Sequence, residues 1–444
     1  MTAPRFPPGF LWGAATSAYQ VEGSPLADGA GASIWHRFAH EPGRIAGGDT
    51  GDVACDHYRR WRDDVALMQE LGLTAYRFSI SWSRVLPEGA GRVNPAGLDF
   101  YRALVDALRE AGIAPVATLF HWDLPAALED RGGWLHPDAA SWFADYAEAC
   151  FRALDDRVEL WATLNEPWVV ADGGYLRGVL APGHRDLSEA ARAGHHQLLA
   201  HGAAVRAYRA GWRGRIGIAI NVEPKHAASG RPEDAAAAAR ADAYMNRHYL
   251  DPLLLGRYPE ELREVYGKGW DPSFEATVAA AREPLDWLGL NYYTRSVVCA
   301  DPSAWPTGAG RVRQDGAPHT ETDWEVYPGG LEETLAWLAA RYGPLPLYVT
   351  ENGAAFADPP AAEGGRVDDP LRVAYLREHL DAVARAIARG VDVRGYFAWS
   401  LLDNLEWSDG FSRRFGLVHV DFATLARTPK ASAHFYRDRI RDSG

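Results

Sequence analysis

Eight short apolar runs recur along the chain, separated by amphipathic stretches of helix length. Each run is continuously apolar rather than alternating, which is typical of parallel strands buried on both faces. Strand and helix alternating eight times predicts an α/β fold closed into a (β/α)8 TIM barrel. The expected strands are Phe10–Thr16, Thr74–Ser79, Pro115–Phe120, Leu160–Leu164, Ile216–Asn221, Leu285–Leu290, Leu347–Thr350 and Val393–Trp399.

The segments between these runs carry helix start and stop signals. Asn94-Pro95 predicts an N-cap followed by proline at the first helical position, and Asp369-Pro370 predicts the same for a later helix. The chain has 444 residues, more than the ~250 of a typical barrel. We expect the surplus in long βα loops, such as 22–55 and 295–330. No break in composition marks a second domain, so residues 1–444 are expected to form one domain.

A doubly wound open sheet is the alternative architecture. Such a sheet normally carries a glycine-rich phosphate turn after its first strand. Gly13-Ala14-Ala15-Thr16 is a poor match to that turn. The residues that follow the predicted strands also favour a closed barrel.

Charge and cysteine content limit the classes of partner. A formal net charge of −13 argues against nucleic acid and anionic membrane as partners. No apolar stretch is long enough to span a bilayer, and the start lacks a secretory pattern. Cys55, Cys150 and Cys299 show neither a disulfide framework nor metal spacing, so we expect small buried residues in a reducing compartment. The expected location is cytoplasmic.

Polar or aromatic residues stand at the carboxyl end of every predicted strand, where barrels of this type gather their functional groups. Amides, an imidazole and indoles dominate the set. A sugar ring needs that mixture, because its hydroxyls require donors and acceptors and its apolar face requires an aromatic platform. In strand order the residues are Gln20 and Glu22, Arg77, His121 and Trp122, Asn165 and Glu166, Asn221, Asn291 and Tyr293, Glu351, and Trp399.

Two glutamates at these strand ends predict the chemistry. Glu166 lies in Thr-Leu-Asn-Glu-Pro and Glu351 in Val-Thr-Glu-Asn-Gly, and only a closed or wound fold brings such distant positions together. One carboxyl is then able to protonate a leaving group while the other attacks carbon. That pair is the machinery of a glycosidase that retains anomeric configuration.

Each residue also has a purely structural interpretation. Glu166 before proline fits a solvated helix start, Glu351-Asn352-Gly353 fits a turn, and His121 or Trp399 fits the core. Arg77 inside an apolar strand is harder to explain this way, because a buried arginine needs an anion. The coincidence of these residues at eight strand ends favours a functional site.

No metal or cofactor is expected for the reaction. His195, His196 and His201 share one predicted helix without i, i+4 ligand spacing, and we interpret them as packing or surface residues. Metalloprotease, Walker and nucleophile-elbow motifs are absent from the sequence. Two carboxyls are sufficient for glycoside hydrolysis.

Over nearly its whole length the chain resembles glycoside hydrolase family 1, the β-glucosidase family. Each motif is weak alone, but their order along more than 400 residues is specific. The motifs are the segments Phe6–Thr16 and Tyr19–Gly23, Tyr76–Ser79, His121–Pro125, Asn165–Pro167, Asn291–Tyr293, Thr350–Gly353, Trp399–Trp407 and Arg414–Leu417.

The resemblance implies a role for each matching residue. Glu166 would be the acid/base, Glu351 the nucleophile, and Arg77 and Tyr293 would hold Glu351. The residues implied to bind the sugar are Gln20, His121, Trp122, Asn165, Asn291, Trp399, Glu406, Trp407 and Phe415, and those implied for the aglycone side are Trp168, Leu180, Asn221 and Trp324. It also implies a cis peptide bond at Trp399-Ser400.

Two positions bear on substrate preference. Leu180 stands in the aglycone loop, where many members of the family carry histidine. The resemblance therefore leaves the preference for the aglycone open. Branches acting on 6-phosphoglycosides replace the Glu406 position with a small residue and supply lysine and tyrosine nearby. Here Glu406 would repel phosphate, and Arg413-Arg414-Phe415 lacks that arrangement. The resemblance therefore implies an unphosphorylated β-glycoside as substrate.

We expect double displacement, with the two carboxyls ~5–5.5 Å apart. At that distance the charge of Glu351 should raise the pKa of Glu166, while Arg77 keeps Glu351 ionised. Two alternatives remain open. A transglycosidase shares the covalent intermediate and differs in its acceptor, and a catalytically silent barrel would bind sugar without cleaving it.

Overall fold

Eight parallel strands close into a barrel in the computed structural model, which describes residues 6–358 and 365–443. The order around the barrel is β1-β11-β10-β7-β5-β4-β3-β2. All eight predicted strands are confirmed, with ends shifted by one or two residues. Their bounds are Leu11–Ala15 (β1), Ala75–Ser79 (β2), Ala114–Phe120 (β3), Leu160–Asn165 (β4), Arg215–Asn221 (β5), Trp287–Asn291 (β7), Leu347–Asn352 (β10) and Val393–Trp399 (β11).

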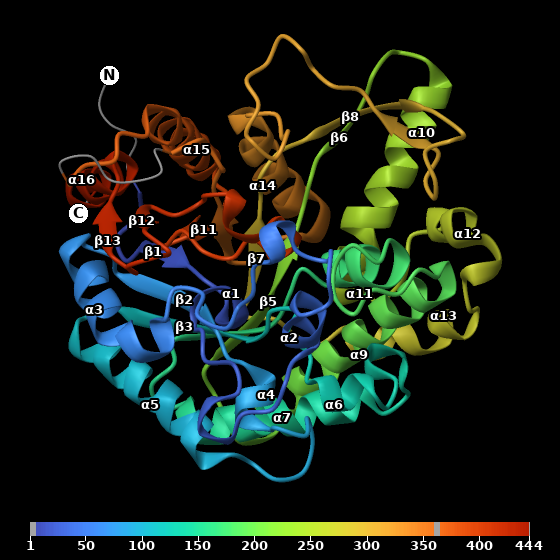
Figure 1. Cartoon of the computed structure of the whole chain (residues 1–444). Helices are drawn as coiled ribbons and strands as arrows, with labels where there is room; N and C mark the ends of the chain where they lie inside the picture. The colour runs from blue at the N-terminus through green and yellow to red at the C-terminus, as the bar shows by residue number, and fades with distance from the viewer. Residues whose placement is uncertain (1–5, 359–364, 444) are drawn as a thin grey trace.

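Helices surround the strands (Figure 1). The longer ones are α3 (His57–Glu70), α5 (Pro95–Glu110), α7 (Ala139–Leu154), α9 (Leu187–Gly211), α10 (Pro232–Asp242), α14 (Pro328–Tyr342), α15 (Pro370–Ala388) and α16 (Ala431–Ser443). Asn94 and Asp369 occupy the predicted N-cap positions, although neither side chain makes a capping hydrogen bond. No helix of the described residues is long and apolar enough to cross a membrane.

Short helices occupy the connections. They are α1 (Ala18–Val21), α2 (Ile34–Ala39), α4 (Trp82–Val85), α6 (Ala126–Glu129), α8 (Pro167–Val169), α11 (His248–Leu255), α12 (Glu261–Tyr266) and α13 (Ser273–Thr277). The predicted loop 22–55 contains α2 between two 3₁₀ turns. The histidines of α9 pack as predicted: His195 is buried and stacks on Phe274, with ring centroids 4.3 Å apart.

The expected loop 295–330 contains two strands that the sequence analysis missed. β8 (Ser296–Ala300) and β9 (Ala309–Arg311) join β6 (Lys225–Ala227) in a three-stranded sheet outside the barrel. A hairpin of β12 (Val418–Val420) and β13 (Arg427–Pro429) lies near the end of the chain. Cys55 and Cys150 are buried as expected, whereas Cys299 is half-buried because it lies on the peripheral strand β8.

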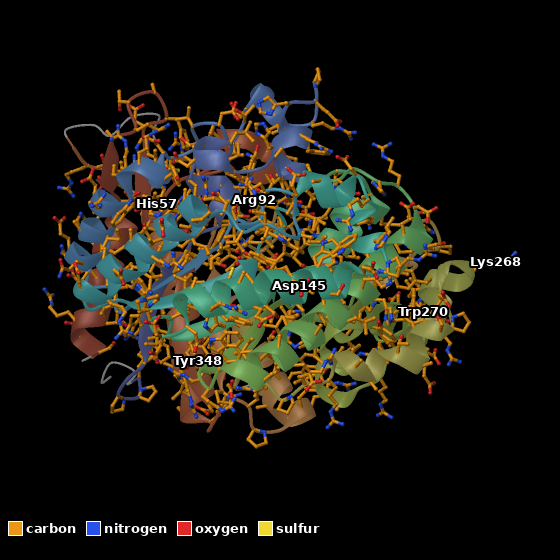
Figure 2. All side chains as sticks on the ribbon, turned by 90° about the horizontal axis from the view of Figure 1, so that it is seen from below. His57, Arg92, Asp145, Lys268, Trp270 and Tyr348 are labelled. Atoms are coloured by element: carbon orange, nitrogen blue, oxygen red, sulfur yellow. The ribbon has the colours of Figure 1, made fainter. Side chains whose placement is uncertain are left out.

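The apolar core has two main parts, beside a small cluster of Ala354, Phe356 and Tyr375. The larger part lies between the strands and the surrounding helices, and the smaller part fills the inside of the barrel with Trp287, Tyr348 and Phe397. Figure 2 shows side chains packed closely throughout the molecule, with Lys268 at its edge. Barrel interiors are packed in layers of this kind rather than open.

Glycines on neighbouring strands make room for the interior aromatics. A Cβ added at Gly217 would lie 2.3 Å from the carbonyl oxygen of Trp287 and 2.7 Å from its indole. A Cβ at Gly13 would lie 2.3 Å from the ring of Phe397. These distances are below van der Waals contact, so the bulky interior residues depend on glycine across the strand pair.

We therefore expect Gly217→Ala to lower the free energy of unfolding by ~1–3 kcal/mol, the usual cost of overpacking a core. Gly230→Ala is the matched control, because Gly230 is exposed and a Cβ there meets nothing within 4 Å. Chemical denaturation of both variants measures the difference. Equal stability of the two variants would contradict the packing argument.

Candidate active site

Two adjoining cavities lie at the carboxyl ends of the barrel strands. The inner recess has a volume of about 60 Å³, and the outer cavity has a volume of about 510 Å³. Both glutamates line the recess. Its walls are His121, Trp122, Glu166, Tyr293, Trp324, Glu351, Trp399, Glu406, Trp407 and Phe415. Six of the predicted strand-end residues, including both glutamates, therefore line one recess.

Glu351 lies in β10, in the last residues of the strand rather than after it, and is 3% exposed. One carboxyl oxygen accepts a hydrogen bond from Arg77 at 2.5 Å, and the other accepts from the Tyr293 hydroxyl at 2.6 Å. Both oxygens are thus held by donors, one of them charged. Charge-assisted bonds of this kind stabilise a carboxylate and fix its direction.

Arg77 also connects the two glutamates. Its second terminal nitrogen donates to the side-chain oxygen of Asn165 at 2.7 Å. The Asn291 amide donates to that same oxygen at 3.0 Å and to Glu166 at 2.7 Å. A continuous chain of hydrogen bonds therefore runs from Glu351 through Arg77, Asn165 and Asn291 to Glu166.

This network determines the tautomer of His121. Arginine has no acceptor, so the Asn165 atom that it contacts is the oxygen, and the Asn165 nitrogen donates to His121 Nε2 at 3.1 Å. Burial, and next the charge of Arg77, lower the pKa of His121 well below its ordinary value, so the ring is neutral. Nε2 accepts, and Nδ1 therefore carries the proton. His121 Nδ1 is buried and has no hydrogen-bond partner in the described chain.

Glu166 is the first residue after β4 and is 6% exposed. Burial, and next the negative charge of Glu351, raise the pKa of Glu166 to about 8. Asn291 and Arg77 act in the opposite direction but are weaker. The two carboxyls thus differ in state, because one is held by a guanidinium and a phenol while the other has a single amide donor. Such divergent environments separate an acid from a nucleophile.

The rim of the recess is built from the loop after β11. Glu406 lies beside Gln20, whose amide donates to the Leu405 carbonyl at 2.9 Å and approaches the Glu406 carboxyl at 3.4 Å. The pKa of Glu406 rises to about 8, first because of burial and then because of the charge of Asp409. Trp407 packs its ring 4.5 Å from that of Trp122, between centroids. Carboxyl, amide and indoles therefore converge at this rim.

Three lining residues hold a left-handed backbone. The φ angles are 48° for Glu166, 78° for Trp122 and 48° for Trp407. This region costs a non-glycine residue ~1–3 kcal/mol, and such residues concentrate at functional sites. In each case the chain turns sharply where the side chain enters the cavity. The predicted cis peptide bond at Trp399-Ser400 is present.

The outer cavity contains Trp168, Leu180, Asn221 and Trp324, the four residues expected on the aglycone side. Its wall also includes residues that the sequence analysis missed: Arg177, Glu223, Lys225, Tyr244 and Arg311. Glu223 and Lys225 follow β5 and were detectable as strand-end residues. Arg311 lies on β9 and carried no such signal.

Some predicted site residues lie behind the recess wall rather than in it. Gln20, Arg77 and Asn165 are fully buried and contact the lining residues Glu406, Glu351 and His121. Glu22, noted at the end of the first strand, is used structurally. Its carboxyl accepts hydrogen bonds from Arg84 at 3.0 Å and from Tyr101 at 2.7 Å. Arg84 is buried and needs an anion as partner. The Glu22 carboxyl is therefore directed toward Arg84 and away from the recess.

A (β/α)8 barrel with two unlike glutamates at its carboxyl end defines the class of glycoside-cleaving enzymes. The family model of glycosyl hydrolase family 1 matches residues 2–444, and the chain belongs to this family. Beta-glucosidase A of Thermotoga maritima is 47% identical, with 100% of this chain and 99% of that protein covered. The bifunctional beta-D-glucosidase/beta-D-fucosidase of Bifidobacterium breve is 44% identical, with 98% of each covered.

A solved structure agrees with these sequence comparisons. It is the beta-glucosidase from Thermotoga maritima in complex with castanospermine, with a TM-score of 0.96 and 47% identity. The match covers 100% of this chain and 99% of that one. The fold and the family assignment are therefore consistent with each other along the whole chain.

The raised pKa of Glu166 predicts an alkaline limb in the pH profile of hydrolysis. Glu166 is an acid only while protonated, and its pKa of about 8 keeps it so up to that pH. We expect kcat/KM for a poor leaving group to fall as pH rises through about 8. Glu166→Gln should lack that limb in its residual activity on the same substrate, whereas Glu406→Gln should keep it. An unchanged limb in Glu166→Gln would show that another group titrates.

Proposed function

We propose that this protein is a retaining β-glucosidase that releases the terminal non-reducing sugar from unphosphorylated β-glycosides. The observation that carries the proposal is the pair of unlike carboxyls in one recess, Glu351 held by Arg77 and Tyr293, and Glu166 with a raised pKa. The names of the relatives support glucosides as substrates. The relative from Bifidobacterium breve supports fucosides as further substrates, and we extend the expectation to galactosides.

In the first step an oxygen of Glu351 attacks the anomeric carbon. The glycosidic carbon–oxygen bond breaks, and the proton of Glu166 passes to the departing oxygen. The product is a glycosyl ester on Glu351 and an ionised Glu166. Arg77 and Tyr293 hold the attacking carboxylate so that it reaches the carbon with little loss of orientational freedom.

In the second step Glu166 acts as a base. Once Glu351 is esterified its negative charge is gone, which removes the second largest of the causes that raise the pKa of Glu166. The ionised form of Glu166 then persists and takes a proton from water. The water oxygen bonds to the anomeric carbon, the ester bond breaks, and the sugar leaves with its configuration retained.

We assign sugar recognition to the other residues of the recess. His121 offers its imidazole, and Glu406 and Trp407 offer a carboxyl and an indole N–H to outer hydroxyls. Gln20 and Asn165 hold these groups from behind, while Trp399 and Phe415 supply apolar walls. Trp168, Leu180, Asn221 and Trp324 would face the aglycone.

We further propose that the chain acts as one catalytic domain in the cytoplasm. The acidic composition and three free cysteines support a reducing compartment and a small-molecule partner rather than nucleic acid or membrane. Measuring enzyme activity in cytosolic and membrane fractions tests the location.

The role assignment predicts distinct losses at the two glutamates. Glu351→Gln should abolish turnover, because no nucleophile remains. Glu166→Ala should retain slow hydrolysis of dinitrophenyl glycosides, whose leaving group needs no proton, and azide should restore the rate by attacking the intermediate that lacks its base. The glycosyl azide product is followed by chromatography. If azide fails to rescue Glu166→Ala and Glu351→Gln remains active, the assignment of Glu166 as acid/base and Glu351 as nucleophile is wrong.

The proposed substrate predicts a preference among nitrophenyl sugars. The β-glucoside should be cleaved at least ~100-fold faster, as kcat/KM, than its 6-phosphate, because the phosphate would enter a recess whose lining holds three carboxyls and no lysine or arginine. Glu406→Gln should narrow that ratio. A preference for the phosphorylated sugar would contradict the proposal. Binding without cleavage would indicate a silent sugar-binding barrel, and predominant transfer products would indicate a transglycosidase.

A further inference from the structure

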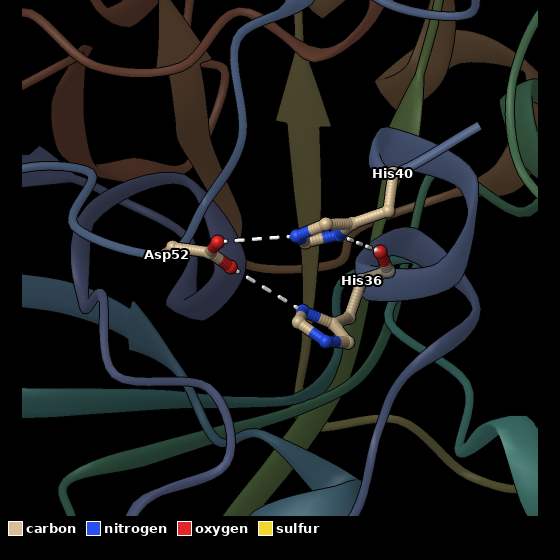
Figure 3. Close-up of side chains that lie close together, drawn as sticks. All are labelled: His36, His40 and Asp52. Atoms are coloured by element: carbon tan, nitrogen blue, oxygen red, sulfur yellow. Dashed lines mark hydrogen bonds and ion pairs between the residues drawn. The ribbon is translucent and has the colours of Figure 1, made fainter. Parts of the chain in front are cut away.

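Three potential metal ligands converge outside the recess. His36 lies in α2, His40 is the residue that ends this helix, and Asp52 belongs to the segment that leads toward α3. Figure 3 shows both imidazole rings turned toward the Asp52 carboxyl. One nitrogen of each ring and one carboxylate oxygen lie within 4.8 Å of one another. His36 and His40 have the i, i+4 spacing of a helical ligand pair, which the sequence prediction of no metal ligands overlooked.

The separations suit a small divalent ion. His40 Nε2 lies 3.1 Å from one oxygen of Asp52, and His36 Nδ1 lies 3.5 Å from the other. Tetrahedral ligands bonded at ~2.0–2.1 Å are roughly 3.3 Å apart. Binding therefore needs only small movements of the side chains. Imidazole and carboxylate together favour Zn²⁺, Ni²⁺ or Cu²⁺ over Mg²⁺ or Ca²⁺.

The orientation of His40 fits a ligand. Its Nδ1 lies 2.7 Å from the carbonyl oxygen of His36 and donates to it, so the lone pair of the neutral ring is on Nε2. That lone pair faces Asp52. Histidines that bind metals are typically oriented in this way, by a carbonyl on the other ring nitrogen. The geometry thus places a nitrogen lone pair against a carboxylate, an arrangement that needs a cation or a proton between the two atoms.

His36 adds an unsatisfied nitrogen beside the hydrogen-bonded pair of His40 and Asp52. Its Nδ1 makes no hydrogen bond in the described chain, although the atom itself is buried. Arg37 lies between the two histidines in sequence, but its guanidinium donates to Asp130 and so does not neutralise the charge of Asp52. The side chains of His40 and Asp52 are 44% and 46% exposed, which leaves a path for an ion and room for water ligands.

We propose that His36, His40 and Asp52 form a binding site for a divalent transition-metal ion, with water completing its coordination. The ion would join α2 to the segment around Asp52. Both segments support the rim of the recess: Trp35 packs its ring 4.4 Å from Trp407, and Asp49 accepts from the backbone N–H of Phe411 at 2.8 Å. The site therefore lies behind the sugar-binding rim and takes no part in bond cleavage.

Calorimetric titration of Ni²⁺ or Zn²⁺ into chelator-treated, tag-free protein tests the site. We expect one ion per chain and a rise in the melting temperature. Affinity should fall ~10-fold or more in His40→Ala and in Asp52→Ala, and binding should disappear in His36→Ala/His40→Ala. Co²⁺ should give a visible d–d spectrum that the double variant lacks.

His434→Ala is the matched control, because His434 is an exposed histidine on α16 away from the cluster. It should bind like the original protein. Glycosidase activity without added metal reports whether each variant is folded and should be unchanged in all of them. Equal affinity in the double variant and the original protein would overturn the proposal. The absence of any binding by the original protein at millimolar ion would also overturn it, leaving an ordinary ion pair held by protons.

Discussion

The buried guanidinium of Arg77 is the interaction on which the site depends. It is fully buried, and its nitrogens donate to Glu351, Asn165, the Thr118 hydroxyl and the Thr350 carbonyl. These partners lie on β10, β4 and β3, while Arg77 itself lies on β2. One cation thus ties four strands together at the level of the recess. A buried charge is tolerated only with such a set of partners. Arg77 therefore needs Glu351 as a partner in place of water, and the same contact fixes the position of Glu351.

The same guanidinium explains why the three recess carboxyls differ. Glu166, Glu351 and Glu406 share a nearly dry space with one cation, which cannot stabilise three negative charges. Glu351 has the direct bond to Arg77, whereas the pKa values of Glu166 and Glu406 are raised by burial and by neighbouring negative charge. The proposed division of roles between Glu351 and Glu166 follows from which carboxyl contacts the arginine.

Much of this arrangement was predictable, because a barrel strand has a strong signature. Runs buried on both faces must be apolar, and the residue that follows such a run must lie at the rim, as Glu166 does. The missed features have no such signature. β6 is Lys-His-Ala and half exposed, so no periodicity marks it, and Arg311 on β9 reaches the outer cavity only through that sheet. The His36, His40 and Asp52 cluster depends on how a loop folds back, which spacing alone does not specify.

Closure of the barrel accounts for contacts that an open sheet would not make. β1 and β11 are the first and last strands of the barrel in sequence, yet they pair along five residues, from Leu11 to Ala15. That pairing brings Gln20 beside Glu406, 386 positions later. It also sets Trp35 against Trp407. In a doubly wound sheet the two terminal strands would be far apart, and the rim of the recess would have only one side. The rim is therefore a product of the closed topology, and the proposed metal site lies on the same seam between the two ends of the chain.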